Sequence, residues 1–178
     1  MLRDFNWKTL IKIGLLAGLI QVATGVAMYL AGIYFVPWSI FVSLIVLLLS
    51  IVLGTLWYRA SALKGQISFG QALIVGIVIS ITTGIVYAVY NIISISFVYS
   101  NFLEDMINAS LAAAPSSQRT PEFIAAMRET VTAKTMAAAN LIRLSVLGTI
   151  LSVFASFFVK NKRAADERGT RRSEIQSA

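Results

Sequence analysis

Hydrophobic residues follow one another in three long stretches that contain no charged residue, over residues 13–58, 65–103 and 144–159. A helix that crosses a bilayer needs about 20 consecutive apolar residues. The first stretch is long enough for two such helices, separated where Pro37 and Trp38 supply a turn and an interfacial ring. The pattern therefore predicts an all-α polytopic membrane protein with four transmembrane helices, over about residues 8–35, 38–58, 68–100 and 138–159.

Composition supports this fold class. The chain has 178 residues, of which 57% are hydrophobic and 13% are charged, whereas a soluble domain has about 25% charged residues. Core helices of a soluble protein do not contain apolar runs of this length. A cleavable signal peptide is also disfavoured, because residues 13–36 exceed the usual apolar region of about 7–15 residues and no small-residue cleavage site follows. We therefore exclude a soluble enzyme.

Positive charge predicts the orientation. Most of the 15 Lys and Arg residues flank the N-terminus, the connection between spans two and three, and the C-terminus. Because cytoplasmic flanks of membrane proteins are rich in Lys and Arg, we expect both termini in the cytoplasm of a bacterium, with the spans in its inner membrane. Residues 1–160 form one transmembrane domain, and residues 161–178 form a disordered basic cytoplasmic tail.

Spans three and four are longer than a bilayer requires. Ser68 and Gln71 fit a capping box, and Thr120 with Pro121 fits a second helix start. The helical pattern runs from Ser68 toward residue 114 and from Pro121 to residue 160. It predicts two long antiparallel helices that project outside the membrane as an extracytoplasmic helical hairpin over residues 101–137. A polar loop is the alternative for this region. In this hairpin the numbers of facing residues add to about 234. Glu104 and Asp105 then come level with Arg128, within about one turn.

Three residues are candidates for binding a ligand or a lipid. Arg143 is the one charged residue that the apolar pattern places near membrane depth, and the hairpin places Asn91 opposite it, with Tyr87 nearby. A charge inside a membrane is a functional hypothesis by default. The alternative is that Arg143 lies near the outer interface and extends its side chain to phosphates or water. Both interpretations stay open.

Small residues recur at helical spacing in three spans, of which span four carries Ser145, Gly148 or Thr149, Ser152 and Ser156. Gly14, Gly18, Gly25 and Gly32 fall on one face of span one, with Gln21 between them, and span three carries a second series at Gly76, Ser80 and Gly84. Small residues at these intervals let membrane helices approach closely. They indicate packing within the chain or contacts in a homo-oligomer.

Several kinds of chemistry are missing. The chain has no Cys and no His, and no Asp or Glu lies within a span. No phosphate-binding, zinc or paired-carboxylate motif occurs, so we expect no cofactor, no metal and no enzymatic activity. The net charge of +7 lies in short flanks, which is typical of membrane topology and not of nucleic-acid binding. The expected partners are membrane lipids and either another membrane protein or further copies of this chain.

A family resemblance rests on particular segments. Residues 67–72 open a long third span that ends in residues 87–91, and an outer Pro-initiated helix leads to the ending at residues 157–160. This pattern resembles the bacterial four-span family catalogued as domain of unknown function forty-one ninety-nine. The resemblance implies an inner-membrane protein and no assigned activity. On the residues themselves we expect an accessory or scaffold subunit of a membrane complex, or alternatively an oligomeric lipid-handling or small-solute permeation protein.

Overall fold

The structure is a computed structural model that describes residues 5–97, 101–115 and 119–160. Within those ranges all regular structure is helical, which confirms the predicted all-α fold. The six helices are α1 (Trp7–Leu30), α2 (Ser39–Ala62), α3 (Phe69–Phe97), α4 (Phe102–Ala113), α5 (Pro121–Thr130) and α6 (Ala133–Val159). The predicted basic tail over residues 161–178 lies outside the described residues.

Four of these helices are long and apolar enough to cross a membrane. They are α1 and α2 with 24 residues each, α3 with 29 and α6 with 27. At about 1.5 Å per residue each exceeds the roughly 30 Å hydrocarbon core of a bilayer. Large side chains such as Leu19, Leu53 and Ile142 are 60–63% exposed on their outer faces, which suits contact with lipid. The chain is therefore a membrane-spanning helical protein, as the apolar pattern predicts.

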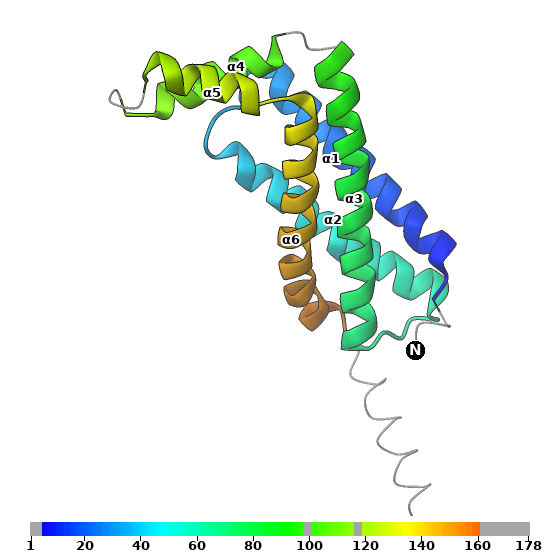
Figure 1. The fold of residues 1–178 in the computed structure, drawn as a ribbon. Helices are drawn as coiled ribbons and strands as arrows, with labels where there is room; N and C mark the ends of the chain where they lie inside the picture. The colour runs from blue at the N-terminus through cyan, green and yellow to red at the C-terminus, as the bar shows by residue number, and fades with distance from the viewer. Residues whose placement is uncertain (1–4, 98–100, 116–118, 161–178) are drawn as a thin grey trace, which may run out of the picture.

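Helix α3 is central to the fold. It packs against α6 along much of its length and against α1 and α2 on its other sides. Figure 1 shows α3 and α6 running side by side, while α1 and α2 are tilted relative to them. The C-terminal end of α3 lies beside α4 and α5, at what we call the arm end of the core. The N-terminal end of α3 lies at the opposite end.

Glycine and serine interlock at the contact between α3 and α6. A Cβ atom at Gly76 of α3 would lie 2.5 Å from the Oγ of Ser152, and Gly148 of α6 is pressed in the same way against Ser80. Each serine hydroxyl donates within its own helix, Ser80 to the Gly76 carbonyl (2.8 Å) and Ser152 to the Gly148 carbonyl (2.6 Å). The two backbones therefore approach closely without leaving these hydroxyls unsatisfied.

The predicted glycine stripe on α1 faces α3. Gly14 and Gly18 lie against Thr82 and Val86 of α3, and Gly25 is buried farther along the same face. The residue numbers of α1 and α3 increase in the same direction along this contact, so the two helices run parallel. The small-residue spacing of span one is therefore used for packing inside the chain.

Gly32, predicted to belong to that stripe, instead ends α1. Its φ is +70°, and its N–H bonds to the Tyr29 carbonyl (3.0 Å) while the Ile33 N–H bonds to the Met28 carbonyl (3.0 Å). This pair of bonds is a Schellman cap, in which glycine adopts the left-handed conformation that other residues avoid. The predicted end of span one at residue 35 is wrong, because the cap stops the helix at Leu30 while the apolar run continues.

Two predicted helix starts are confirmed. The Ser68 N–H donates to Gln71 Oε1 (3.0 Å) and the Gln71 N–H donates to Ser68 Oγ (3.4 Å), which is the predicted capping box before α3. The Thr120 hydroxyl accepts the N–H of Phe123 (3.3 Å), and Pro121 takes the first position of α5. Both caps satisfy backbone groups that the first turn of a helix leaves free.

Helices α4 and α5 form an arm that extends sideways from the core, as Figure 1 shows. They are the two helices of the predicted hairpin over residues 101–137, but neither is continuous with the span next to it. Helix α3 ends at Phe97 and α4 begins at Phe102, so no single helix runs on to residue 114. On the return side α5 ends at Thr130 and α6 begins at Ala133, so no single helix runs from Pro121 to residue 160.

A second capping box explains the break between α5 and α6. Val131 and Thr132 have extended backbone angles. The Thr132 N–H donates to Thr135 Oγ1 (2.9 Å), and the Thr135 N–H donates to Thr132 Oγ1 (3.2 Å). β-Branched residues lose side-chain freedom in a helix, and threonine hydroxyls compete with the helical backbone. These two residues therefore interrupt a helix without a proline or a glycine.

The bent arm changes the alignment of α3 with α6. Gly76 faces Ser152 and Ser80 faces Gly148, and both pairs of residue numbers add to 228. The predicted value of about 234 is wrong, because it assumes two straight helices that meet at a central turn. With a sum of 228, Arg143 lies level with residue 85 of α3. Asn91 is six residues, or about 9 Å, farther along the axis of α3.

The close contact at Gly76 can be tested by substitution. We expect Gly76→Ala to destabilise the protein by about 1–3 kcal/mol, because its Cβ would meet Ser152 and Ile51 in a filled interior. The matched control is Gly70→Ala in the same helix, where an added Cβ meets nothing within 4 Å. The measurement is the thermal unfolding midpoint of both variants in detergent. Equal midpoints would contradict the interlocked packing.

Candidate functional site

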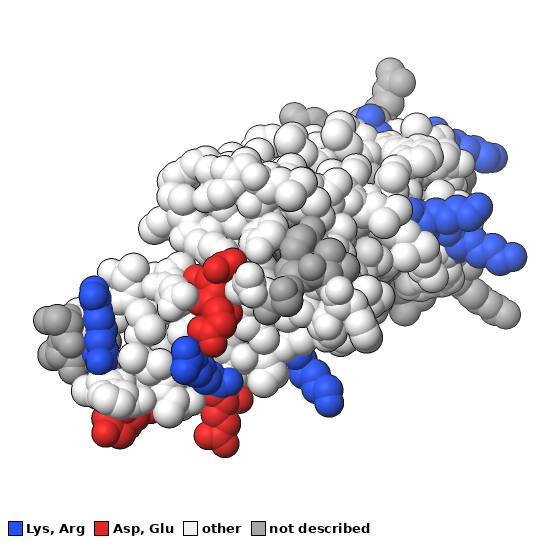
Figure 2. Space-filling view, turned by 90° about the horizontal axis from the view of Figure 1, so that it is seen from above, with Lys and Arg blue, Asp and Glu red and all other residues white. Residues whose placement is uncertain are grey.

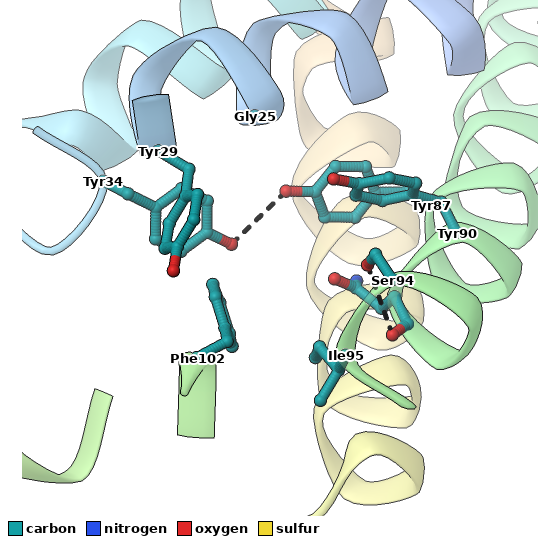
Figure 3. A pocket seen from close by; sticks show the side chains of 9 residues that line it. Gly25, Tyr29, Tyr34, Tyr87, Tyr90, Ser94, Ile95 and Phe102 are labelled. Atoms are coloured by element: carbon teal, nitrogen blue, oxygen red, sulfur yellow. Dashed lines mark hydrogen bonds between the residues drawn. The ribbon is translucent and has the colours of Figure 1, made fainter. Parts of the chain in front are cut away.

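A small cavity lies inside the arm end of the core, between α1, the loop that follows it, α3 and α4 (Figure 3). Its volume is about 10 Å³, which is room for about one water molecule. Five of the side chains around it carry a hydroxyl and one carries an amide. The cavity is lined by Gly25, Tyr29, Tyr34, Tyr87, Tyr90, Asn91, Ser94, Ile95 and Phe102.

Two tyrosines bridge this cavity. The Tyr87 hydroxyl of α3 lies 3.4 Å from the Tyr34 hydroxyl, which comes from the loop between α1 and α2 (Figure 3). Gly25 makes room for the Tyr87 ring, since a Cβ there would lie 2.8 Å from the hydroxyl oxygen. The Ser39 hydroxyl donates to the Tyr34 carbonyl (2.8 Å) and holds the loop. The hydroxyl pair therefore connects the α1–α2 loop to α3.

The structure brings together two of the three predicted site residues. Tyr87 and Asn91 lie one helical turn apart on α3, and both line the cavity, with 4% and 3% of their surface exposed. Arg143 of α6 does not line the cavity. It is half-buried and close enough to Tyr87 for an electrostatic interaction. A role of these residues in binding a ligand or a lipid stays a prediction.

Two buried asparagine amides lack hydrogen-bond partners in the described part of the chain. They are the Nδ2 groups of Asn91 and of Asn140, which lies on α6 and is 6% exposed. An unsatisfied buried donor costs about 1–3 kcal/mol, and one water molecule in the cavity would give Asn91 a partner. Asn140 was not among the residues predicted from the sequence. The sequence feature that could have identified it is a single amide side chain within the alanine-rich and apolar stretch of span four.

An aromatic cluster closes the arm side of the cavity. Tyr29, Tyr34, Phe35 and Phe102 have ring centroids 5.2–6.4 Å apart in every pair. These spacings are those of favourable aromatic pairs. Phe102 begins α4, so the cluster anchors the arm to the α1–α2 loop. Our sequence analysis did not identify this cluster, although several aromatic residues near one end of span one were a signal for it.

The described acidic residues gather at one end of the molecule, where Arg119, Arg128 and Lys134 also lie. All described acidic residues lie on the arm, and Figure 2 shows the red side chains gathered there. The Arg128 guanidinium pairs with Glu104 at 3.3 Å, as predicted. Five basic residues lie at or near the opposite end: Lys8, Lys12, Arg59, Lys64 and Lys160.

The groups around the cavity define its chemistry. Hydroxyls and amides can hold a small neutral or dipolar group by hydrogen bonding. Within the described ranges, no group of three or more His, Cys, Asp or Glu side chains is placed to hold a metal ion.

The unpartnered amide of Asn91 leads to a stability prediction. We expect Asn91→Leu to leave the thermal unfolding midpoint unchanged or to raise it, because it removes a buried donor without a protein partner. The matched control is Gln21→Met. Gln21 is equally buried and its Oε1 also lacks a partner among the described residues, but its Nε2 group donates to the Ser43 hydroxyl. The loss of this hydrogen bond should lower the midpoint. A large destabilisation by Asn91→Leu would instead show that a bound molecule satisfies this amide.

Comparison with known proteins places the chain in a family. The model of a protein family of unknown function, DUF4199, matches residues 12–161. No curated protein and no solved structure matches the chain. The matched region contains α2 to α6 completely and most of α1. This membrane-spanning helical chain therefore belongs to the DUF4199 family of proteins of unknown function.

Proposed function

We propose that this protein is a non-enzymatic accessory or scaffold subunit of a complex in the bacterial inner membrane. The arm carries this proposal. Helix α5 has 10 residues, and none of them is buried. Its main contact with the described chain is with α4. Because a short isolated helix gains little stability from its own backbone, a partner surface would stabilise α5.

The exposed face of α5 indicates the chemistry of that partner. Glu122 and Glu129 are seven residues apart, which places them on the same face of the helix, two turns apart. Both are exposed, and the only ion pair in the described ranges joins Arg128 to Glu104. Phe123 beside them is 40% exposed. A basic surface with an apolar rim on a second membrane protein would complement this face.

The tight core favours a scaffold over a conduit. The described interior between α3 and α6 is filled by interlocked glycine and serine, and the cavity at its arm end has room for about one water molecule. A solute that crosses the membrane needs a continuous polar path, and these contacts would obstruct one within a single chain.

The alternative function is an oligomeric lipid-handling or small-solute permeation protein. One observation favours it. An apolar groove of about 390 Å³ lies between α1 and α2, lined by residues that include Leu16, Val46 and Leu53. Such a groove suits an acyl chain or a helix of another copy.

The proposed orientation places the arm outside the cell and both termini in the cytoplasm. It is supported by the basic residues at the end of the core opposite the arm. The chain contains no cysteine, so single cysteines can be labelled uniquely. We expect Ala126→Cys on α5 to react with a membrane-impermeant maleimide in intact spheroplasts. Ser61→Cys at the end of α2 should react only after permeabilisation, and the reverse pattern would contradict the orientation.

The scaffold proposal predicts a protein partner that depends on the acidic face of the arm. We expect the tagged chain, solubilised from native membranes in mild detergent, to retain a stoichiometric membrane protein. The double variant Glu122→Gln with Glu129→Gln should lose most of it, because two charges of the docking face are removed. The measurement is quantitative mass spectrometry of the purified samples.

A matched control separates this local effect from a change of net charge. The double variant Ser61→Lys with Gln66→Lys changes the net charge by the same amount at exposed positions of the opposite end, and it should retain the partner. The proposal is wrong if no stoichiometric partner is recovered, or if the arm variant retains it fully. Recovery of a homo-oligomer with one enriched lipid would favour the alternative function.

A further inference from the structure

A wider pocket opens on the outside of the aromatic cluster, between the α1–α2 loop and α4. Its volume is about 570 Å³. Three aromatic rings form part of its wall, and a carboxylate and an amide of α4 form another part. The pocket is lined by Tyr29, Leu30, Gly32, Tyr34, Phe35, Asp105 and Asn108.

The Asp105 carboxylate gives this pocket a negative charge. Its one side-chain hydrogen bond in the described ranges comes from the Tyr29 hydroxyl, at 3.5 Å. The only ion pair in the part of the chain that the structure describes involves its neighbour Glu104 and not Asp105. Within the part of the chain that the structure describes, this negative charge beside aromatic rings is therefore not paired with a basic side chain. This arrangement attracts a cation to the carboxylate and disfavours a phosphate or a carboxylate at the same position.

The aromatic rings restrict which cation fits. The face of an aromatic ring is electronegative and binds ammonium groups within about 6 Å of its centre. Tyr29, Tyr34 and Phe35 are half-buried, and the Asp105 side chain is exposed at the mouth of the pocket. Tyr29, Tyr34 and Phe35 are held in place by one another and by Phe102. Their positions are thus set before a ligand arrives. A divalent metal ion would need about six oxygen ligands, whereas the lining offers one carboxylate, one amide and two phenols.

We propose that this pocket binds an ammonium group, held by the Asp105 carboxylate and by the rings of Tyr29, Tyr34 and Phe35. The pocket lies at the arm end of the four spans, which is the depth at which lipid headgroups lie on that side of the membrane. The ammonium group comes either from the ethanolamine headgroup of a phospholipid or from a free amine in solution. This proposal concerns a different surface from the α5 face and does not depend on a protein partner.

The experiment uses the purified full chain in a non-ionic detergent, with two probes. Choline chloride tests a free ammonium compound, with sodium chloride at equal ionic strength as the reference, and thermal unfolding reports binding. Phosphatidylethanolamine tests a lipid headgroup, with phosphatidylglycerol as the reference, and native mass spectrometry reports the lipid retained. We expect at least one ammonium probe to bind in preference to its reference.

Three variants locate the binding to the pocket. Asp105→Asn and Phe35→Leu should each weaken the binding by about tenfold, because one removes the charge and the other removes a ring at similar volume. The matched control is Glu104→Gln, which changes the charge of the neighbouring residue outside the pocket and should bind like the original protein. Comparable unfolding midpoints without ligand show that the variants are folded.

Each outcome decides the proposal. If the protein retains phosphatidylethanolamine selectively, does not respond to choline, and loses the lipid in Asp105→Asn, the proposal is supported with the lipid as the source. A response to choline that is also lost in Asp105→Asn supports it with a free amine as a ligand. The proposal is overturned if neither probe is preferred over its reference, or if Asp105→Asn and Phe35→Leu bind as well as Glu104→Gln does.

Discussion

The close approach of α3 to α6 is the constraint on which the remaining structure depends. In a membrane, lipid tails are as apolar as leucine, so helices gain nothing by hiding hydrophobic side chains from their surroundings. Association then relies on van der Waals contact, and contact requires that backbones come close. Gly76 and Gly148 permit this, and Ser152 and Ser80 fill the space that they leave. Helices α1 and α2 then pack against the same central helix, and the arm-end cavity forms where α1 and α3 meet the loop and α4.

Much of this fold could be predicted from local features of the sequence. The four spans are visible as uncharged apolar runs, and the starts of α3 and α5 are visible as capping residues. These features work because each depends on residues a few positions apart. The end of α1 at Gly32 was also a local signal, but the apolar run continues beyond it, and we gave the run more weight than the glycine.

The shape of the arm could not be predicted in the same way. The helical pattern of apolar residues continues through the break at Val131 and Thr132, and two threonine hydroxyls end the helix there. The alignment of α3 with α6 was inferred from a straight hairpin without this break. The predicted position of Arg143 was therefore wrong by about a turn and a half relative to Asn91. Tyr87 and Asn91 were still grouped correctly, since they lie on one helix. The aromatic cluster joins Phe35 to Phe102, and only the folded chain brings such distant positions together.

The interlocked contact between α3 and α6 also constrains how this sequence can evolve. The side chain of Ser80 occupies the place that a side chain at position 148 would need, and Ser152 does the same for position 76. A larger residue at either glycine is tolerated only if the opposite serine becomes smaller. The two positions of each pair must therefore change together, and this coupling would appear among related sequences as correlated substitutions at 76 with 152 and at 80 with 148.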